Sequence, residues 1–424
     1  MSLTKEVYTA YCDILKEELR LAMGCTEPIA IAYSASIARS YLSKEPTAIR
    51  IALSGNIIKN TKSVVVPATG GMHGIPAAVA AGTIANRPEL VLEVLSSLTE
   101  EDVPKMQALL ANCPVEVNEL DTTHIFEIVL WMKNDEEEVV VRLLDRHTNL
   151  VYVEKNKEVL IRNEQEEEDG GIKTDRTLLN VEDIVTFADT VDLEDVRELL
   201  ERQISCNMAI AEEGIRNNYG ACIGQVIYKN GNCSLADKAR AFAAAGSDAR
   251  MNGCELPVCI ISGSGNQGMT ASIPIVIYAR ELQKSEEEML RALVLSDLIT
   301  THLKTGIGCL SAYCGAISAG CGAGAGIAYL YGGKFKEVAH TIVNSLAILS
   351  GTICDGAKSS CAAKIAMAVE SGILGYEMYK NGQQFYGGDG IVTKGVENTI
   401  ANVGKLARLG MSGTDKQIIK IMLE

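Results

Sequence analysis

The sequence contains few aromatic residues and has an excess of acidic over basic residues. Aromatic side chains make up 5% of its 424 residues, with a single Trp. Its 39 Lys and Arg residues are outnumbered by 54 Asp and Glu residues, which gives a formal net charge of −15. Nucleic-acid binding needs a basic surface that neutralises phosphates, so we do not expect a nucleic-acid partner.

The chain also lacks an apolar run of the length that spans a membrane. Its longest apolar stretches are interrupted by glycine, and residues 1–19 are charged and helical in pattern, unlike a secretory signal. We therefore expect a cytoplasmic protein without a membrane span. In a reducing compartment its 13 cysteines are not expected to form a disulfide framework, so they indicate core packing, metal binding or catalysis.

Small residues are abundant, including 38 glycines, and a hydrophobic content of 47% can build a sizeable core. We predict an α+β fold: a mostly helical body of small-residue-rich helices, with an inserted α/β subdomain that contains a partly antiparallel sheet. Residues 1–45 are predicted as N-terminal helices that join the helical body. Residues 46–171 are predicted as the inserted subdomain, and residues 172–424 as the helical catalytic domain.

Three cysteines in the C-terminal half form the most informative motif. Cys354 and Cys361 are separated by six residues, and Cys314 lies upstream in a glycine-dense segment, flanked by Cys309 and Cys321 as alternative ligands. Iron–sulfur clusters are held by cysteine thiolates, and electron-transfer clusters use four of them. Three ligands would leave one iron open to bind a substrate atom as a Lewis acid, which suggests a [4Fe–4S] lyase. The alternative is a set of buried structural cysteines.

Two further segments combine helix starts with reactive or anion-binding groups. Cys25 precedes a predicted helix, whose dipole and free N–H groups would lower the pKa of a thiol and favour a thiolate. The alternative is a buried cysteine at a helix–helix turn. Arg250 is a candidate to bind a substrate carboxylate or, equally, to form an ion pair with Asp248. The glycine turns at 67–76 and 263–268 each place backbone N–H groups at a helix start, which suits an anion.

Four motifs occur in order along the chain: GCTEP at residues 24–28, SDARM at 247–251, GSGNQG at 263–268 and CDGAKSSC at 354–361. Together they resemble the L-cysteine desulfidase family, which is similar to the α portion of bacterial iron–sulfur L-serine dehydratases. The resemblance implies an oxygen-labile [4Fe–4S] cluster held by three cysteines, and no pyridoxal phosphate. It also implies α,β-elimination of L-cysteine to sulfide and aminoacrylate, which hydrolyses to pyruvate and ammonia.

The same resemblance assigns roles to individual residues. Carried over position by position, the cluster ligands are Cys314, Cys354 and Cys361. Cys25 matches the catalytic thiol that would remove the Cα proton, with Glu27 and His73 as alternative bases. The substrate carboxylate is expected to be held by Arg250, Ser264, Asn266 and Gln267.

Two other functions stay open at this point. L-Serine is the rival substrate, because the same open iron would bind a hydroxyl group, and the protein would then be an L-serine dehydratase. The second alternative is a cluster-free protein whose glycine turns bind an anion or an amino acid. The expected partner is a small-molecule amino acid, and self-association into a homo-oligomer is left open.

Overall fold

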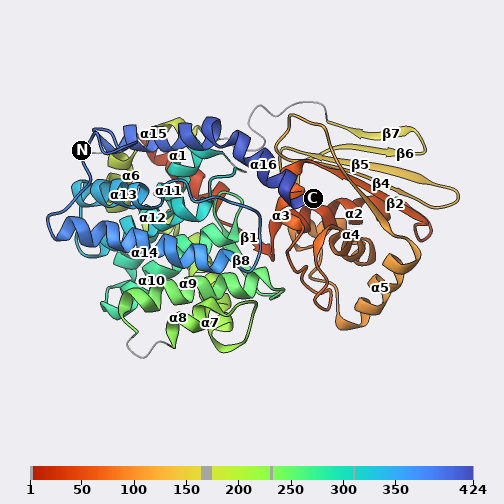
Figure 1. Ribbon diagram of the computed structural model, residues 1–424, viewed down its shortest axis with the longest axis horizontal. Coiled ribbons are helices and arrows are strands. Elements are labelled where there is room, and N and C mark those ends of the chain that lie inside the picture. Colours follow the sequence, from red (N-terminus) through yellow and green to blue (C-terminus); the bar gives the residue numbers. More distant parts are fainter. Residues whose placement is uncertain (1–2, 164–173, 230–232, 309–310, 424) are drawn as a thin grey trace.

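The computed structural model describes residues 3–163, 174–229, 233–308 and 311–423, which fold into a helical lobe and a sheet lobe side by side (Figure 1). Each lobe has its own large hydrophobic core. The predicted α+β class, with a helical body and a partly antiparallel sheet, is confirmed. No helix within these ranges is both long and apolar enough to cross a membrane.

The sheet lobe consists of α2 (Thr26–Ser40), β2 (Ala48–Leu53), α3 (Gly55–Thr61), α4 (Gly74–Ala85), α5 (Val103–Asn112), β3 (Val115–Glu119), β4 (Glu127–Lys133), β5 (Glu138–Leu144), β6 (Leu150–Lys155) and β7 (Glu158–Arg162). Its six strands follow the order β3-β2-β4-β5-β6-β7, with β2 and β3 parallel and all other neighbours antiparallel. Successive side chains along β4 point to opposite faces of the sheet. Ile128, Leu130 and Met132 are buried in the core with α2, whereas Trp131 lies on the other face under the guanidinium of Arg50.

Helix α2 lies in a different core from the one we expected. Residues 1–45 were predicted to join the helical body; α1 (Lys5–Glu18) does so, but the apolar side chains of α2 pack in the sheet-lobe core. Small residues explain this packing, because a Cβ on Gly82 of α4 would lie 1.9 Å from the carbonyl oxygen of Ala32 in α2. The expected boundary at residue 171 lies outside the described residues, so the rest of the domain division stays a prediction.

The helical lobe adds to α1 the elements β1 (Arg20–Met23), α6 (Val181–Thr190), α7 (Arg197–Arg216), α8 (Ile223–Tyr228), α9 (Leu235–Met251), β8 (Pro257–Ile260), α10 (Gly265–Glu281), α11 (Glu286–Ile307), α12 (Gly315–Leu330), α13 (Phe335–Leu349), α14 (Cys361–Lys380) and α15 (Val396–Lys405). Helix α12 packs against α10, α11, α13 and α14. A Cβ on Gly324 of α12 would lie 2.5 Å from the carbonyl oxygen of Gly372 in α14. The glycines therefore allow these two helix backbones to touch, as the small-residue content predicted.

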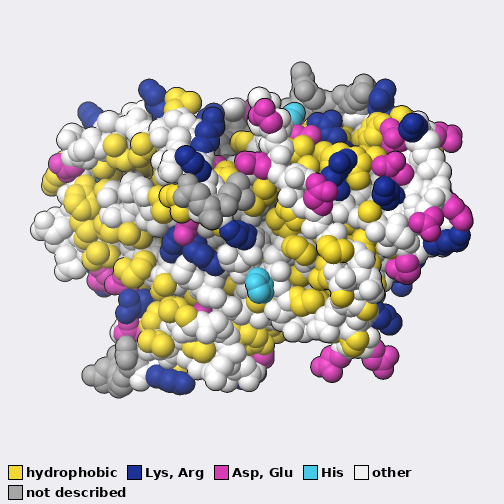
Figure 2. Space-filling model, turned by 45° about the vertical axis from the view of Figure 1, so that its right-hand side comes forward, with side chains coloured by type: hydrophobic (Ala, Val, Ile, Leu, Met, Phe, Trp, Pro, Cys, Tyr) yellow, Lys and Arg dark blue, Asp and Glu magenta, His cyan; other side chains and the backbone are white. Residues whose placement is uncertain are grey.

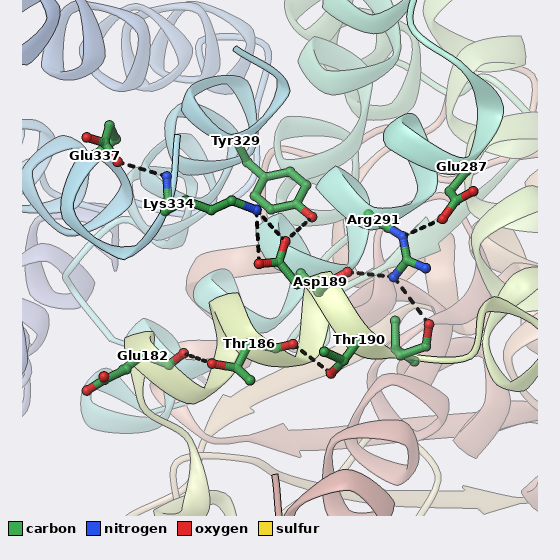
Figure 3. A network of polar contacts seen from close by, with 11 residues as sticks. Glu182, Thr186, Asp189, Thr190, Glu287, Arg291, Tyr329, Lys334 and Glu337 are labelled. Atoms are coloured by element: carbon green, nitrogen blue, oxygen red, sulfur yellow. Dashed lines mark hydrogen bonds and ion pairs between the residues drawn. The ribbon is translucent and has the colours of Figure 1, made fainter. Parts of the chain in front are cut away.

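A polar network fixes α6 against the neighbouring helices (Figure 3). The carboxylate of Asp189 accepts hydrogen bonds from the Tyr329 hydroxyl at 2.6 Å and from Lys334 Nζ at 2.9 and 3.0 Å. Arg291 of α11 donates to the carbonyl oxygen of Ala188 at 2.8 Å, which satisfies one of the free carbonyl groups at the end of α6. These contacts hold the outer helices in place and thereby stabilise the core beneath them.

Asp297 of α11 is a buried carboxyl group with incomplete hydrogen bonding. Its Oδ1 accepts a hydrogen bond from Gln203 at 3.0 Å, and its Oδ2 has no partner among the described residues. Burial raises the pKa of Asp297 from its usual 3.8 to about 8, against the opposing effect of the Gln203 bond. The folded-state pKa thus lies above the unfolded-state value, so the ionised group destabilises the fold increasingly as the pH rises from about 4 to about 8.

We expect the variant Asp297→Asn to lose less stability than the wild type between about pH 5 and about pH 8. The difference in unfolding free energy between the two proteins should change by up to ~1.4 kcal/mol per pH unit, the value expected when unfolding releases one proton. The measurement is urea denaturation of both proteins at several pH values. Subtracting one unfolding free energy from the other removes the contributions of the titrating groups that the two proteins share. Parallel curves for the two proteins would show that Asp297 does not change its ionisation on folding.

The C-terminal helix α16 (Ser412–Leu423) leaves the helical lobe and docks on α3 of the sheet lobe (Figure 1). Asp415 forms an ion pair at 2.5 Å with Lys59 of α3, whose side chain is only 1% exposed. Gly55 leaves the space in which Ile419 packs, because a Cβ there would lie 2.8 Å from Ile419 Cδ1. The last helix therefore ties the two lobes together.

Candidate functional site

A cavity of about 620 Å³ lies between the lobes and is lined by residues of both. Sites for small molecules usually measure roughly 300–1,000 Å³. Lys and Arg side chains gather near the junction of the lobes on the face that Figure 2 shows. The predicted site residues that line the cavity are Cys25, Glu27, Arg250, Ser264, Asn266, Gln267, Cys314, Cys354 and Cys361. The exception is His73, which is exposed at the start of α4 and does not line this cavity, so the structure does not support it as a base.

Four helices begin at the cavity wall. Cys25, Ser264 and Cys314 are the N-cap residues of α2, α10 and α12, and Cys361 is the first residue of α14. Within the described residues, none of these four helix starts is capped by a side-chain hydrogen bond, and only α2 has an acidic residue in its first turn. The free N–H groups and the helix dipoles make this wall electropositive, which favours a bound anion.

Arg250 at the end of α9 adds a full positive charge to the same wall. It is 2% exposed and donates from Nε to the carbonyl oxygen of Gly24 at 3.0 Å and from Nη1 to Asn266 Oδ1 at 3.2 Å. Gly265 makes room for it, because a Cβ there would lie 2.5 Å from Arg250 Nε. Asp248 instead accepts the N–H of Gly224 at 2.9 Å, so the alternative of an Arg250–Asp248 ion pair is not formed in the described structure. Arg250 is therefore oriented toward the cavity by neutral partners.

Gln267 lies next to the start of α12. A Cβ on Gly315 would lie 2.7 Å from the side-chain amide of Gln267, so only glycine lets the two helix starts approach this closely. The Oε1 atom of Gln267 is buried and has no hydrogen-bond partner among the described residues. A ligand in the cavity would supply the missing partner.

Cys25 and Glu27 form a buried pair at the start of α2. The Cys25 thiol donates to Glu27 Oε2 at 3.4 Å, and Asn60 donates to Glu27 Oε1 at 3.0 Å. Burial raises the pKa of Cys25 and the Glu27 carboxylate raises it further, against the opposing effect of Arg250. The expected lowering of this pKa by the helix N-terminus is therefore wrong, because desolvation and a neighbouring carboxylate outweigh the dipole. In the described structure Cys25 is a thiol with a carboxylate as its proton acceptor.

The segments that carry Cys314 and Cys354 are joined by an isolated antiparallel bridge between Tyr313 and Ile353. The N–H of Cys314 donates to the carbonyl oxygen of Thr352 at 3.0 Å, and the N–H of Cys354 donates to that of Ala312 at 2.6 Å. Burial raises the pKa of Cys314 to about 12, and the neighbouring Cys354 and Cys361 thiols raise it as well. Cys314, Cys354 and Cys361 all line the cavity.

Of the two alternative ligands, Cys321 is the one that the described part of the chain contains, and it does not join this group. Cys321 is fully buried in the middle of α12, donates to the Ser345 hydroxyl at 3.0 Å and does not line the cavity. Cys309 lies outside the described residues. The structure thus separates Cys321 from the three cavity cysteines.

The side chains that line the cavity can be compared with the ligands that a single metal ion or an iron–sulfur cluster requires. Across the described part of the chain, no three His, Cys, Asp or Glu side chains converge closely enough to hold a metal ion. A four-iron cluster is larger than one ion, so its thiolate ligands lie farther apart. Cysteine thiolates are the ligands that hold iron–sulfur clusters, so three cysteines that line one cavity have the ligand type that such a cluster needs.

Several cavity residues were missed by sequence reasoning. Asn60 orients Glu27, Lys364 donates to the carbonyl oxygen of Ile353 at 2.9 Å near the cysteines, and His147 faces the cavity from the β5–β6 hairpin. Each stands in a polar turn or a helix end, where such residues are ordinary surface residues. No local pattern distinguishes them, because only the meeting of the two lobes makes them cavity residues.

The fold and the cavity together define a two-lobed α+β protein with a cysteine-lined cavity between its lobes. The chain belongs to the serine dehydratase alpha chain family, whose model matches residues 89–420. It is also similar over its whole length to proteins named UPF0597. The relative from Desulfitobacterium hafniense is 57% identical over 98% of this chain and 97% of the relative. Those from Lachnoclostridium phytofermentans and Treponema denticola are 48% and 45% identical, over 98% and 100% of this chain and 100% of each relative.

Proposed function

We propose that the protein is an iron–sulfur-dependent lyase that converts L-cysteine to sulfide, ammonia and pyruvate by α,β-elimination. The observation that carries this proposal is that three thiols, a thiol–carboxylate pair and an electropositive wall line one cavity of about 620 Å³. Each of these groups suits one requirement of the reaction. The three thiols provide a place for the leaving group, the thiol–carboxylate pair provides a proton acceptor, and the electropositive wall provides a site for the substrate carboxylate.

The cluster would be held by Cys314, Cys354 and Cys361. When bound, it supplies an open iron that stabilises the leaving sulfur atom as a Lewis acid. The substrate carboxylate is assigned to Arg250 and to the start of α10, where Ser264 and Asn266 lie. This placement orients the substrate with its carboxylate at Arg250 and the start of α10 and its Cβ substituent toward the three cysteines.

The Cys25–Glu27 pair is assigned the proton transfer. The Cys25 sulfur takes the Cα proton as its own proton moves along the 3.4 Å hydrogen bond to Glu27 Oε2. The electron pair of the broken Cα–H bond forms the Cα–Cβ double bond, and the Cβ–S electrons leave with the sulfide. Asn60 and the Thr26 hydroxyl, at 3.0 Å from Glu27 Oε1 and Oε2 respectively, hold the carboxylate in place for this step. The pair thus provides a proton acceptor in a buried position.

L-Serine is the second candidate substrate, because the matching family model describes a serine dehydratase chain. The same cavity would bind serine with its hydroxyl group toward the cysteines. The two substrates differ only in the leaving atom, so the decision between them depends on measured turnover.

The deciding assay is the release of sulfide and of pyruvate from L-cysteine and L-serine by anaerobically reconstituted protein. We expect turnover of L-cysteine, and the variant Cys354→Ala should lose both iron and turnover in the same sample. Cys206→Ala is the matched control, because Cys206 lies on α7 outside the cavity and should keep both. Turnover of L-serine alone would make the protein a serine dehydratase. Wild-type turnover without bound iron would overturn the cluster.

A further inference from the structure

His147 lines the cavity from the β5–β6 hairpin, and its role is not explained by the steps above. Its Nε2 atom is buried and, among the described residues, has no hydrogen-bond partner. Phe126 packs edge-on against the imidazole, with ring centroids 4.8 Å apart, and so restrains its orientation. A buried ring nitrogen without a partner destabilises the protein unless water or a ligand provides one, and because His147 lines the cavity this atom is available to a bound group.

The ring of His147 and the glycine turn at the start of α10 line the same cavity. A Cβ placed on Gly263 would lie 3.7 Å from His147 Cε1, so a side chain of one carbon atom on this turn would be in van der Waals contact with the imidazole. The same turn presents Ser264 and Asn266, which are assigned to the substrate carboxylate. A polar group directly beside the carboxylate site matches the chemistry of an α-amino acid, whose ammonium and carboxylate groups are bonded to the same carbon atom.

The surroundings of His147 keep its imidazole neutral. Burial lowers the pKa of His147, and the opposing effect of Glu27 is partly cancelled by Arg146 in the same hairpin. A neutral imidazole with its proton on Nδ1 presents Nε2 as a hydrogen-bond acceptor. An ammonium group has three N–H donors and therefore complements this atom, whereas a carboxylate has none.

We propose that His147 accepts a hydrogen bond from the ammonium group of the substrate and so selects α-amino acids over acids that lack an amine. This inference rests on the proposed amino-acid substrate and adds a specificity-determining residue to it. The helical lobe then binds the carboxylate of the substrate, and the sheet lobe binds its ammonium group. Recognition of a complete amino acid requires both lobes to be in place.

The test uses two ligands that cannot undergo elimination, L-alanine and propionate, in calorimetric titrations of the full-length protein. We expect wild-type protein to bind L-alanine at least about tenfold more tightly than propionate, the ratio for one hydrogen bond to a charged group. His147→Phe keeps the ring shape against Phe126 but removes the acceptor. It should lose that tenfold preference and bind propionate as wild type does.

His147→Gln is the matched variant, because its side-chain oxygen can replace Nε2 as an acceptor, and it should retain most of the preference. Equal weakening of both ligands by His147→Phe would overturn the assignment, since it would indicate contact with the carboxylate or a structural role. An unchanged preference in His147→Phe, or no preference in the wild type, would overturn it as well. Failure of the elimination assay alongside a His147-dependent preference would reject the proposed reaction and leave the amine site standing.

Discussion

Replacing Glu27 by glutamine is expected to lower kcat for sulfide release about 10²–10⁴-fold without loss of iron. This is the usual contribution of a general base. Glutamine has the same shape as glutamate but cannot accept the proton of Cys25, whose raised pKa otherwise keeps the sulfur protonated near neutral pH. The variant Cys25→Ala should produce a loss of the same order if the two residues act as one unit, and the double variant should add little to either.

The measurement is steady-state sulfide release with iron counted on the same samples. Glu127→Gln is the control, because Glu127 is also a buried carboxylate of the sheet lobe, held by Thr122 and Arg142, but it does not line the cavity. It should leave kcat within about twofold of wild type, since most changes away from a site act on stability alone. A Glu27→Gln protein with wild-type kcat would remove Glu27 from the mechanism, and iron loss would indicate a structural role.

The second large effect is expected at the junction between α16 and α3. Asp415→Ala would leave the ammonium group of Lys59 without its partner at a position where the side chain is 1% exposed. Removing one member of a buried ion pair costs about 3–5 kcal/mol, because the remaining charge stays desolvated. The expected result is a lower midpoint in urea denaturation together with increased proteolysis of α16.

The double variant Lys59→Met/Asp415→Leu separates the charge effect from simple loss of packing. It replaces both charges by apolar groups of similar size, and we expect it to regain most of the stability that Asp415→Ala loses. If Asp415→Ala costs less than about 1 kcal/mol, the pair behaves like an exposed surface ion pair and does not lock the lobes. The junction also lies next to the cysteine segment of the site. A Cβ on Gly356, between Cys354 and Cys361, would lie 2.1 Å from the carbonyl oxygen of Lys59, so the backbone of this segment packs closely against α3.

Much of the fold could be predicted from local pattern. The alternation in β4 and the helical spacing in α1 are repeated over enough residues to determine element type, and small residues indicated closely packed helices. The placement of α2 could not be predicted in this way. Its sequence is apolar around most of its circumference, so either core could have accepted it, and the close approach to Gly82 of α4 settles the choice.

The site shows the same division between local and long-range information. The order of four motifs made Cys25, Glu27 and Arg250 candidates through a family resemblance, whereas local chemistry left ordinary structural roles open for Cys25 and Arg250. The ionisation of Cys25 could not be derived from its position at a helix start, since desolvation depends on the other lobe. His147 stands in an ordinary polar turn and could be found only in the assembled cavity.

The amino-acid sequence by itself determined which segments form helices and strands and which side chains carry reactive groups, because both depend on residues close together in the chain. Tertiary structure alone decided that α2 packs with the sheet, that Cys25 stays protonated, and that His147 and the start of α10 line one cavity. The first outcome depends on packing within the sheet lobe, and the other two depend on burial and on contacts between residues far apart in the chain, such as Cys25 and Met251. Such contacts form only when the two lobes come together.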